Sequence, residues 1–177
     1  MRKRGDALAR AKRLRLMIFD VDGVLTDGTL YMTEGGGEIK VFNVRDGHGL
    51  KMLQETGVQA AILSGRRSPV VEARAAELGI KIVEQGHSDK GAAFDRLLSR
   101  LGMSAAAAGY MGDDFPDVPV LARCGFAASV SDAPQAVRRS AHYVARAAAG
   151  RGAAREVCEF IMQAQKTLAG AARKGLA

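Results

Sequence analysis

The sequence contains little of what a secreted, membrane-spanning or disulfide-stapled chain needs. Of its 177 residues two are cysteine, four are proline and none is tryptophan. Cys124 and Cys158 match neither metal-ligand nor disulfide-framework spacing, so we expect a reducing cytoplasm. No apolar run approaches the roughly 20 residues of a membrane span. The short run at residues 16–19 is cut off by Asp20, so it does not form a secretory signal, and we expect neither export nor a membrane partner.

What the sequence does contain is typical of one globular domain, which we assign to residues 1–177. Apolar residues make up 47% and charged residues 25%, which argues against global disorder. Lys and Arg total 26 against 19 Asp and Glu, giving a net charge of +7 that favours anionic partners. Part of this charge lies in a basic N-terminal arm, residues 1–15, which we expect to be solvated or frayed.

Short apolar runs alternate with helical segments that end at glycine. This alternation predicts an α/β fold built on a parallel sheet. The expected strands are residues 16–21, 58–63, 80–83, 108–111, 126–130 and 143–145, and the expected helices are residues 49–56, 69–78, 90–101 and 157–168.

One segment interrupts this alternation. Residues 29–31 and 38–44 are β-prone and flank the sequence Thr-Glu-Gly-Gly-Gly at 33–37, which predicts a β-hairpin. We place this hairpin, residues 29–44, as an insertion after the first strand. Its apolar positions Ile39, Val41 and Phe42 favour a subunit partner.

The chemistry begins where the first strand ends, at Asp20, Asp22 and Gly23. Ligands of open α/β sheets bind outside the carboxyl ends of the strands. Carboxylates at i and i+2 of an extended segment face the same side, and glycine permits a sharp exit. The same pattern also occurs in ordinary turns and in calcium loops, so the pair alone does not decide the function.

Three further segments extend this pattern. Ser64 and Gly65 follow the second core strand and offer a hydroxyl and backbone N–H groups to a phosphate oxygen, although such pairs are also common turns. Lys90 stands at a helix start, where a fixed anion explains a cation better than the helix dipole does, with a surface lysine as the alternative. The acids Asp113, Asp114 and Asp117 repel one another unless a cation such as Mg²⁺ offsets them.

These four segments, in this order, resemble the haloacid dehalogenase superfamily of phosphotransferases. The resemblance covers roughly residues 16–130 and implies a Rossmann-like, doubly wound parallel sheet of the haloacid dehalogenase type. It also implies a magnesium-dependent phosphatase that forms an aspartyl-phosphate. The implied roles are nucleophile for Asp20, general acid and base for Asp22, phosphoryl binding for Ser64 and Lys90, metal binding for Asp20, Asp113 and the main-chain carbonyl of Asp22, and support for Asp114 and Asp117.

A narrower resemblance is carried by residues 42–49, 85–90 and 150–158, which look like the 3-deoxy-D-manno-octulosonate 8-phosphate phosphatase family. That family implies a capless homotetramer acting on a small anionic sugar phosphate in lipopolysaccharide synthesis. The short spacings between Asp20, Ser64 and Lys90 agree, because they leave no room for a cap domain. The C-terminal helix and tail, residues 150–177, are then expected to reach a neighbouring subunit's site.

Departures from this pattern leave the exact sugar open: His48 and His87 replace an aromatic and an amide, Val118 replaces a common tryptophan, and the tail after Gly170 is individual.

A sugar acid presents phosphate and carboxylate groups, and guanidinium groups bind carboxylates with two parallel hydrogen bonds. Our candidates for substrate binding are Arg66, Arg74 and Arg151, although Arg74 also suits an exposed helix face and Arg151 a linker. One alternative on the same scaffold is a phosphatase for a nine-carbon sugar-acid phosphate or for another phosphoester, and the basic arm would favour the phosphate end of a nucleic acid. A second alternative is a non-catalytic binding module. We expect no nucleic-acid partner, and the intact acids argue against the module.

Overall fold

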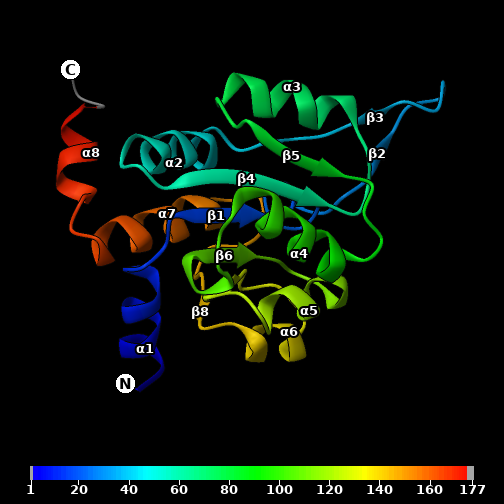
Figure 1. Ribbon diagram of the computed structural model, residues 1–177. Coiled ribbons are helices and arrows are strands. Elements are labelled where there is room, and N and C mark those ends of the chain that lie inside the picture. The colour runs from blue at the N-terminus through cyan, green and yellow to red at the C-terminus, as the bar shows by residue number, and fades with distance from the viewer. Residues whose placement is uncertain (1, 175–177) are drawn as a thin grey trace.

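A six-stranded parallel sheet forms the centre of the structure (Figure 1). The computed structural model describes residues 2–174. The strands are β1 (Leu16–Phe19), β4 (Gln59–Ser64), β5 (Ile82–Gln85), β6 (Ala108–Met111), β7 (Phe126–Ser129) and β8 (Tyr143–Val144). They lie in the order β5-β4-β1-β6-β7-β8, and all neighbouring pairs are parallel. The predicted α/β fold is confirmed, with strand ends that differ by up to two residues.

Helices cover both faces of this sheet. One face carries α2 (Val44–Glu55), α3 (Pro69–Glu77) and α7 (Ala153–Ala164), with α1 (Arg2–Ala11) and α8 (Leu168–Lys174) beside α7. The other face carries α4 (Lys90–Leu101), α5 (Val118–Leu121) and α6 (Gln135–Ser140), with the short 3₁₀ turns η1 (Ala105–Ala107) and η2 (Phe115–Asp117) nearby. The fully buried side chains between these layers include Phe19, Ile62, Leu50, Phe94 and Ile161. The sheet is therefore doubly wound and buried on both faces.

The order of the strands reverses at β1. From β1 the chain moves outward through β4 and β5, and it then crosses back to β6, β7 and β8 on the other side. The loops after β1 and β6 therefore diverge at neighbouring strand ends, which is where open α/β sheets bind their ligands. In Figure 1 these ends lie at the right, on the same side as the hairpin and opposite both termini.

The hairpin after β1 is present but shorter than predicted. Its strands are β2 (Tyr31–Met32) and β3 (Glu38–Ile39), paired antiparallel, and the turn is closed by hydrogen bonds between Thr33 and Gly37 and between Gly36 and Thr33. Residues 40–43 lie outside the strand. Within residues 2–174, the hairpin and α2 are the only elements between β1 and β4, so no cap domain lies there.

The helix after the hairpin begins earlier than its pattern indicated. We predicted a start at Gly49, but α2 begins at Val44 because the side chain of Asn43 accepts a hydrogen bond from the N–H of Arg45 and caps the helix. Gly47 and Gly49 have low helix propensity, so the sequence did not indicate that the helix includes this first turn. Gly49 allows a close approach, because an added Cβ would lie 3.0 Å from the backbone Cα of Arg155, whereas a Cβ at Gly47 would meet the movable end of the Arg74 side chain.

The expectation of a frayed N-terminal arm is wrong for most of its length. Residues 2–11 form α1, in which Ala7 and Ala11 are fully buried against the body of the protein. Arg10 donates a hydrogen bond to the carbonyl of Gly125, and the Gln165 amide donates to the carbonyls of Ala11 and Leu14. Ala7 and Ala11, at spacing i, i+4, form a narrow apolar stripe on α1. The many basic residues around them kept this stripe from being recognised in the sequence.

The C-terminal segment forms two helices instead of one. The predicted helix 157–168 is replaced by α7, which starts at Ala153, and by α8, which follows a break at residues 165–167. Lys166 in this break has a positive φ of 61°. Residues 175–177 of the predicted tail lie outside the described residues. Within residues 2–174, no helix is both long and apolar enough to cross a bilayer.

Candidate active site

The carboxyl ends of β1, β4 and β6 and the start of α4 surround a cavity of about 410 Å³. Asp20 follows β1, Ser64 ends β4, Asp113 follows β6 and Lys90 begins α4. The residues predicted for catalysis, metal binding and support all line this cavity, together with one predicted arginine: Asp20, Asp22, Ser64, Arg66, Lys90, Asp113, Asp114 and Asp117. Parallel strands bring them together because every strand ends at the same edge of the sheet.

Lys90 is the buried cation of the site. Its ammonium is 2.6 Å from Asp20 Oδ2 and 2.6 Å from Asp117 Oδ1, and it donates a hydrogen bond to each. Burial by itself lowers the pKa of a lysine, but the two carboxylates outweigh burial and hold the pKa of Lys90 above its usual value. Lys90 therefore stays charged and offers a fixed positive charge beside Asp20.

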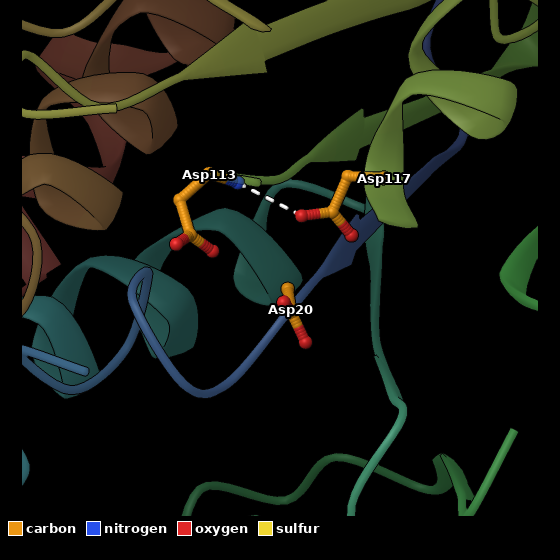
Figure 2. Close-up of side chains that lie close together, drawn as sticks. All are labelled: Asp20, Asp113 and Asp117. Atoms are coloured by element: carbon orange, nitrogen blue, oxygen red, sulfur yellow. Dashed lines mark hydrogen bonds between the residues drawn. The ribbon is translucent and has the colours of Figure 1, made fainter. Parts of the chain in front are cut away.

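Three carboxylates lie close together in Figure 2, where Asp113 comes from the loop after β6, Asp117 from the end of η2 and Asp20 from the end of β1. One oxygen from each of Asp20, Asp113 and Asp117 lies within 4.8 Å of the other two. Burial and then the charge of Asp117 raise the pKa of Asp20 to about 7, against the effect of Lys90. Burial and then the charges of Asp20 and Asp117 raise the pKa of Asp113 to about 8. The raised pKa values show that Lys90 alone does not balance the negative charge of the three carboxylates. Such an excess of negative charge is what a bound cation would neutralise.

Asp117 differs from the other two because both of its carboxylate oxygens already accept hydrogen bonds within the protein. It accepts hydrogen bonds from Lys90, from the Tyr110 hydroxyl at 2.6 Å, and from the N–H groups of Asp113 at 2.9 Å and Asp114 at 3.1 Å. The bond to Asp113 is the dashed line in Figure 2. Asp117 therefore fixes the loop and Lys90, whereas Asp113 Oδ1 is buried with no hydrogen-bond partner among the described residues.

Asp114 and Gly23 shape the loops around this cluster. The Asp114 side chain caps η2 by accepting from the N–H of Phe115 at 2.8 Å. Gly23 has φ +89°, and a Cβ there would lie 2.1 Å from Asp113 Oδ2. Only glycine both adopts this backbone and leaves the Asp113 carboxylate in place.

Asp22 lies in the cavity but outside the carboxylate cluster. Its side chain is turned toward the hairpin, where Lys40 Nζ donates a hydrogen bond to Oδ1, and Arg66 Nε lies 3.7 Å from Oδ2. Its carboxylate is therefore not among the three that cluster around Asp20. Sequence reasoning missed Lys40 and its neighbour Glu38, although their alternation with Ile39 and Val41 was a usable signal.

The three predicted arginines have different surroundings. Arg66 lines the cavity, with its guanidinium 2.7 Å from Glu38 Oε2. Arg74 lies over the ring of Phe42, 5.8 Å from its centroid, and pairs with Glu77. Arg151 is 73% exposed and lies 3.9 Å from Asp27. Within this chain Arg74 and Arg151 do not line the cavity.

His87 also lines the cavity and was not predicted for the site. Its Nε2 lies 3.0 Å from Glu84 Oε2, and its N–H donates to the Ser64 carbonyl at 3.3 Å. This backbone bond connects the strand carrying Ser64 with the loop leading to Lys90. In the sequence, only its position directly after Gln85-Gly86 could have indicated that His87 belongs to the site.

Comparison with known proteins agrees with this geometry. Residues 80–157 match the haloacid dehalogenase-like hydrolase family. The chain is 46% identical over 166 residues to the 3-deoxy-D-manno-octulosonate 8-phosphate phosphatase of Yersinia pestis, covering 94% of this chain and 89% of that protein.

Solved structures extend the similarity to the whole fold. A probable phosphatase from Pseudomonas syringae is 48% identical, with a TM-score of 0.95 and coverage of 98% of both chains. The 3-deoxy-D-manno-octulosonate 8-phosphate phosphatase of Moraxella catarrhalis, solved with a magnesium ion, a phosphate ion and the sugar acid, is 37% identical, with a TM-score of 0.94 and coverage of 97% and 98%. This chain therefore belongs to the 3-deoxy-D-manno-octulosonate 8-phosphate phosphatase family of haloacid dehalogenase-like hydrolases.

Proposed function

We propose that this protein hydrolyses 3-deoxy-D-manno-octulosonate 8-phosphate to the free sugar acid and phosphate, a step of lipopolysaccharide synthesis in the cytoplasm. The observation that carries the proposal is the pairing of Asp20 with a buried Lys90, next to the open carboxylate of Asp113. The relatives named for this activity support the choice of substrate. Both cysteines are free and buried, which agrees with a reducing compartment.

The residues of the site fit magnesium as the cofactor. Mg²⁺ prefers oxygen ligands and is usually held by one or two carboxylates while keeping several waters. Asp20 and Asp113 would hold it, with the main-chain carbonyl of Asp22, because Asp117 already accepts four hydrogen bonds. When bound, the ion neutralises charge on the transferring phosphoryl group.

Asp20 and Asp22 supply the covalent chemistry. Asp20 attacks the phosphorus atom, forming an acyl-phosphate, while Asp22 protonates the departing sugar oxygen. Asp22 then takes a proton from the water that attacks the acyl-phosphate, and Asp20 is released with inorganic phosphate. Lys90 and Ser64 bind the phosphoryl oxygens, and the charge of Lys90 offsets the negative charge that spreads over them.

Asp114 and Asp117 keep the loop after β6 in the shape that this chemistry requires. Asp117 also holds the ammonium of Lys90 at the phosphoryl position, since it shares that ammonium with Asp20.

The sugar end of the substrate is assigned to the three arginines. Arg66 is at the cavity and half exposed, so it can contact a substrate carboxylate within one subunit. Arg74 and Arg151 lie outside the cavity of their own chain, and we assign Arg151 to the site of a neighbouring subunit. Its exposure supports that assignment.

A homotetramer assembled through the hairpins would cover the open site. The hairpin and the segment after it expose Leu30, Met32, Ile39, Val41 and Val44 at 50% or more. Exposed apolar side chains on short paired strands suit burial against another copy. Such an assembly would replace the cap domain that is absent between β1 and β4 among the described residues.

Phosphate release from 3-deoxy-D-manno-octulosonate 8-phosphate tests the proposal when it is compared with a nine-carbon sugar-acid phosphate, simple sugar phosphates and a 5′-phosphorylated oligonucleotide. We expect the octulosonate ester to have the highest kcat/KM by at least about tenfold, and EDTA to abolish turnover until Mg²⁺ is restored. Preference for another ester would reject the substrate, and full activity in EDTA would reject the cofactor.

A further inference from the structure

Four charged side chains form a closed ring at the edge of the cavity. Lys40 donates a hydrogen bond to Asp22 Oδ1 and lies 3.4 Å from Glu38 Oε1. Arg66 donates to Glu38 Oε2 at 2.7 Å and lies 3.7 Å from Asp22 Oδ2. Cations and anions alternate around the ring, and every carboxylate oxygen in it faces a cation.

The ring depends on how the hairpin alternates. The side chains of Glu38 and Lys40 are 14% and 4% exposed and contact Arg66 and Asp22 of the cavity lining, whereas Ile39 and Val41 are each 55% exposed. Side chains of an extended chain alternate between two sides, so one short segment presents charges to the site and apolar groups to the surroundings.

The burial of Lys40 is unexpected on structural grounds alone. Removing an ammonium from water costs several kcal/mol unless good partners offset it, and a lysine at a hairpin normally extends into solvent. Here the Lys40 stem crosses to the loop after β1 and delivers its charge to Asp22, two positions beyond the nucleophile. Replacing a buried ion pair by well-packed apolar residues is often neutral or stabilising, so packing of the hairpin alone does not explain a lysine at this position.

We propose that Lys40, itself held by Glu38, is a positioning residue that fixes the carboxyl group of Asp22 for proton transfer to the leaving oxygen. This inference rests on the proposed function, in which Asp22 is the general acid. Asp22 lies on the loop after β1, and without the hydrogen bond from Lys40 only the 3.7 Å contact with Arg66 holds its carboxyl group, which then also samples positions that miss the leaving oxygen. Misplacement by about 1 Å is enough to lower a rate about a hundredfold.

The leaving group of the substrate separates this role from a general structural one. The C8 oxygen of the sugar would depart as a strongly basic alkoxide and therefore needs a proton, whereas the weakly basic nitrophenolate of p-nitrophenyl phosphate departs without one. The value of kcat/KM reports the steps through leaving-group departure. A defect in the placement of Asp22 therefore lowers kcat/KM for the sugar phosphate and spares the aryl phosphate.

The experiment measures kcat/KM for both esters with saturating Mg²⁺ in Lys40→Met. We expect a loss of about 10- to 100-fold on the sugar phosphate and less than about threefold on p-nitrophenyl phosphate. Lys40→Arg keeps a cation at this position and should recover most of the loss. Lys81→Met, which removes an exposed lysine at the opposite end of the sheet, should match the unmodified protein on both esters.

Asp22→Asn and the double variant complete the test. Asp22→Asn should show the same selectivity with a larger loss, and adding Lys40→Met to it should cause little further loss on the sugar phosphate, because both act at one step. Equal losses on both esters in Lys40→Met, no loss on either, or additive losses in the double variant would overturn the role of Lys40.

Failure of the proposed function looks different. If the unmodified protein hydrolyses neither ester with Mg²⁺, or if Asp22→Asn loses both esters equally, the phosphatase assignment or the acid role of Asp22 is rejected whatever Lys40 does. Light scattering and thermal unfolding of each variant check assembly and folding. Should Lys40→Met not fold, Glu38→Gln, which loosens Lys40 while leaving it in place, must show the same selectivity for the inference to stand.

Discussion

The ammonium of Lys90 lies 2.6 Å from a carboxylate oxygen of Asp20, although the two residues are 70 positions apart in the sequence. Asp117 holds the same ammonium from its other side at 2.6 Å. The end of β1, the start of α4 and the turn η2 therefore meet at one buried charge, and the stability of the site and its chemistry depend on the same contacts.

Replacing the nucleophile should abolish activity without unfolding the protein. We expect Asp20→Asn to lower magnesium-dependent phosphate release by about 10⁴-fold or more, because an amide cannot form the acyl-phosphate. Circular dichroism should remain unchanged, since the amide is close in size to the carboxyl. Asp95→Asn, at an exposed carboxylate of α4, is the matched control and should keep full activity. Unchanged turnover in Asp20→Asn would remove the nucleophile assignment.

Removing the buried cation should cost stability as well as activity. Lys90→Met leaves Asp20 and Asp117 facing each other without a counter-charge, which we expect to destabilise the metal-free protein by about 3 kcal/mol. The loss should be larger at about pH 8 than at about pH 6, since protonation relieves the repulsion. Urea unfolding in EDTA at both pH values measures it. An unfolding free energy that is unaffected at either pH would contradict the pairing.

Magnesium binding should strengthen as the pH rises. The pKa values of Asp20 and Asp113 are raised from the ordinary aspartate value of 3.8 to about 7 and about 8 in the folded protein. The folded metal-free protein therefore binds more protons than the unfolded chain from about pH 4 to 8, so its stability falls as pH rises through this window.

Mg²⁺ competes with these protons. Its addition should accordingly raise Tm more at about pH 8.5 than at about pH 6, measured by thermal unfolding with Mg²⁺ and with EDTA. In Asp113→Asn the difference between the two pH values should shrink. A gain in Tm that is independent of pH would mean that these carboxylates are not the ligands.

Gly23→Ala separates backbone strain from damage to the metal site. The added Cβ would lie 2.1 Å from Asp113 Oδ2 at a φ of +89°. Gly57→Ala is a close control, because φ is +94° and a Cβ there meets no described atom within 4 Å. Both variants should lose about 1 kcal/mol of stability, but only Gly23→Ala should also need a much higher Mg²⁺ concentration for half-maximal activity. Equal Mg²⁺ requirements would show that Asp113 can shift at no cost.

A charge on the outer side of the hairpin should break the assembly. Ile39 is 55% exposed, and Ile39→Asp is expected to convert the oligomer to a smaller species in size-exclusion chromatography with light scattering. Val70→Asp, at a 38% exposed apolar residue on α3, is the control and should leave the mass unchanged. A monomeric unmodified protein would reject the tetramer directly.

The alternation of buried apolar runs with glycine-stopped helices was enough to predict the parallel sheet, because strands buried on both faces must be apolar throughout. Residues at strand ends, such as Asp20 and Ser64, could be assigned to one site for a related reason: parallel strands bring their carboxyl ends to one edge. The start of α2 and the helix α1 could not be predicted, since a cap by Asn43 and a stripe of two alanines are weak signals that tertiary packing reinforces.

Local periodicity and the geometry of parallel strands were sufficient to predict the sheet, the hairpin and the acids at the strand ends. The different roles of those acids, in contrast, depend on contacts that form only when the whole chain folds. Asp117 accepts hydrogen bonds from Lys90, Tyr110 and two backbone N–H groups. Asp113 Oδ1 has no hydrogen-bond partner among the described residues, and Asp22 accepts a hydrogen bond from Lys40. Such pairings depend on distances between segments far apart in the chain, which no local pattern encodes.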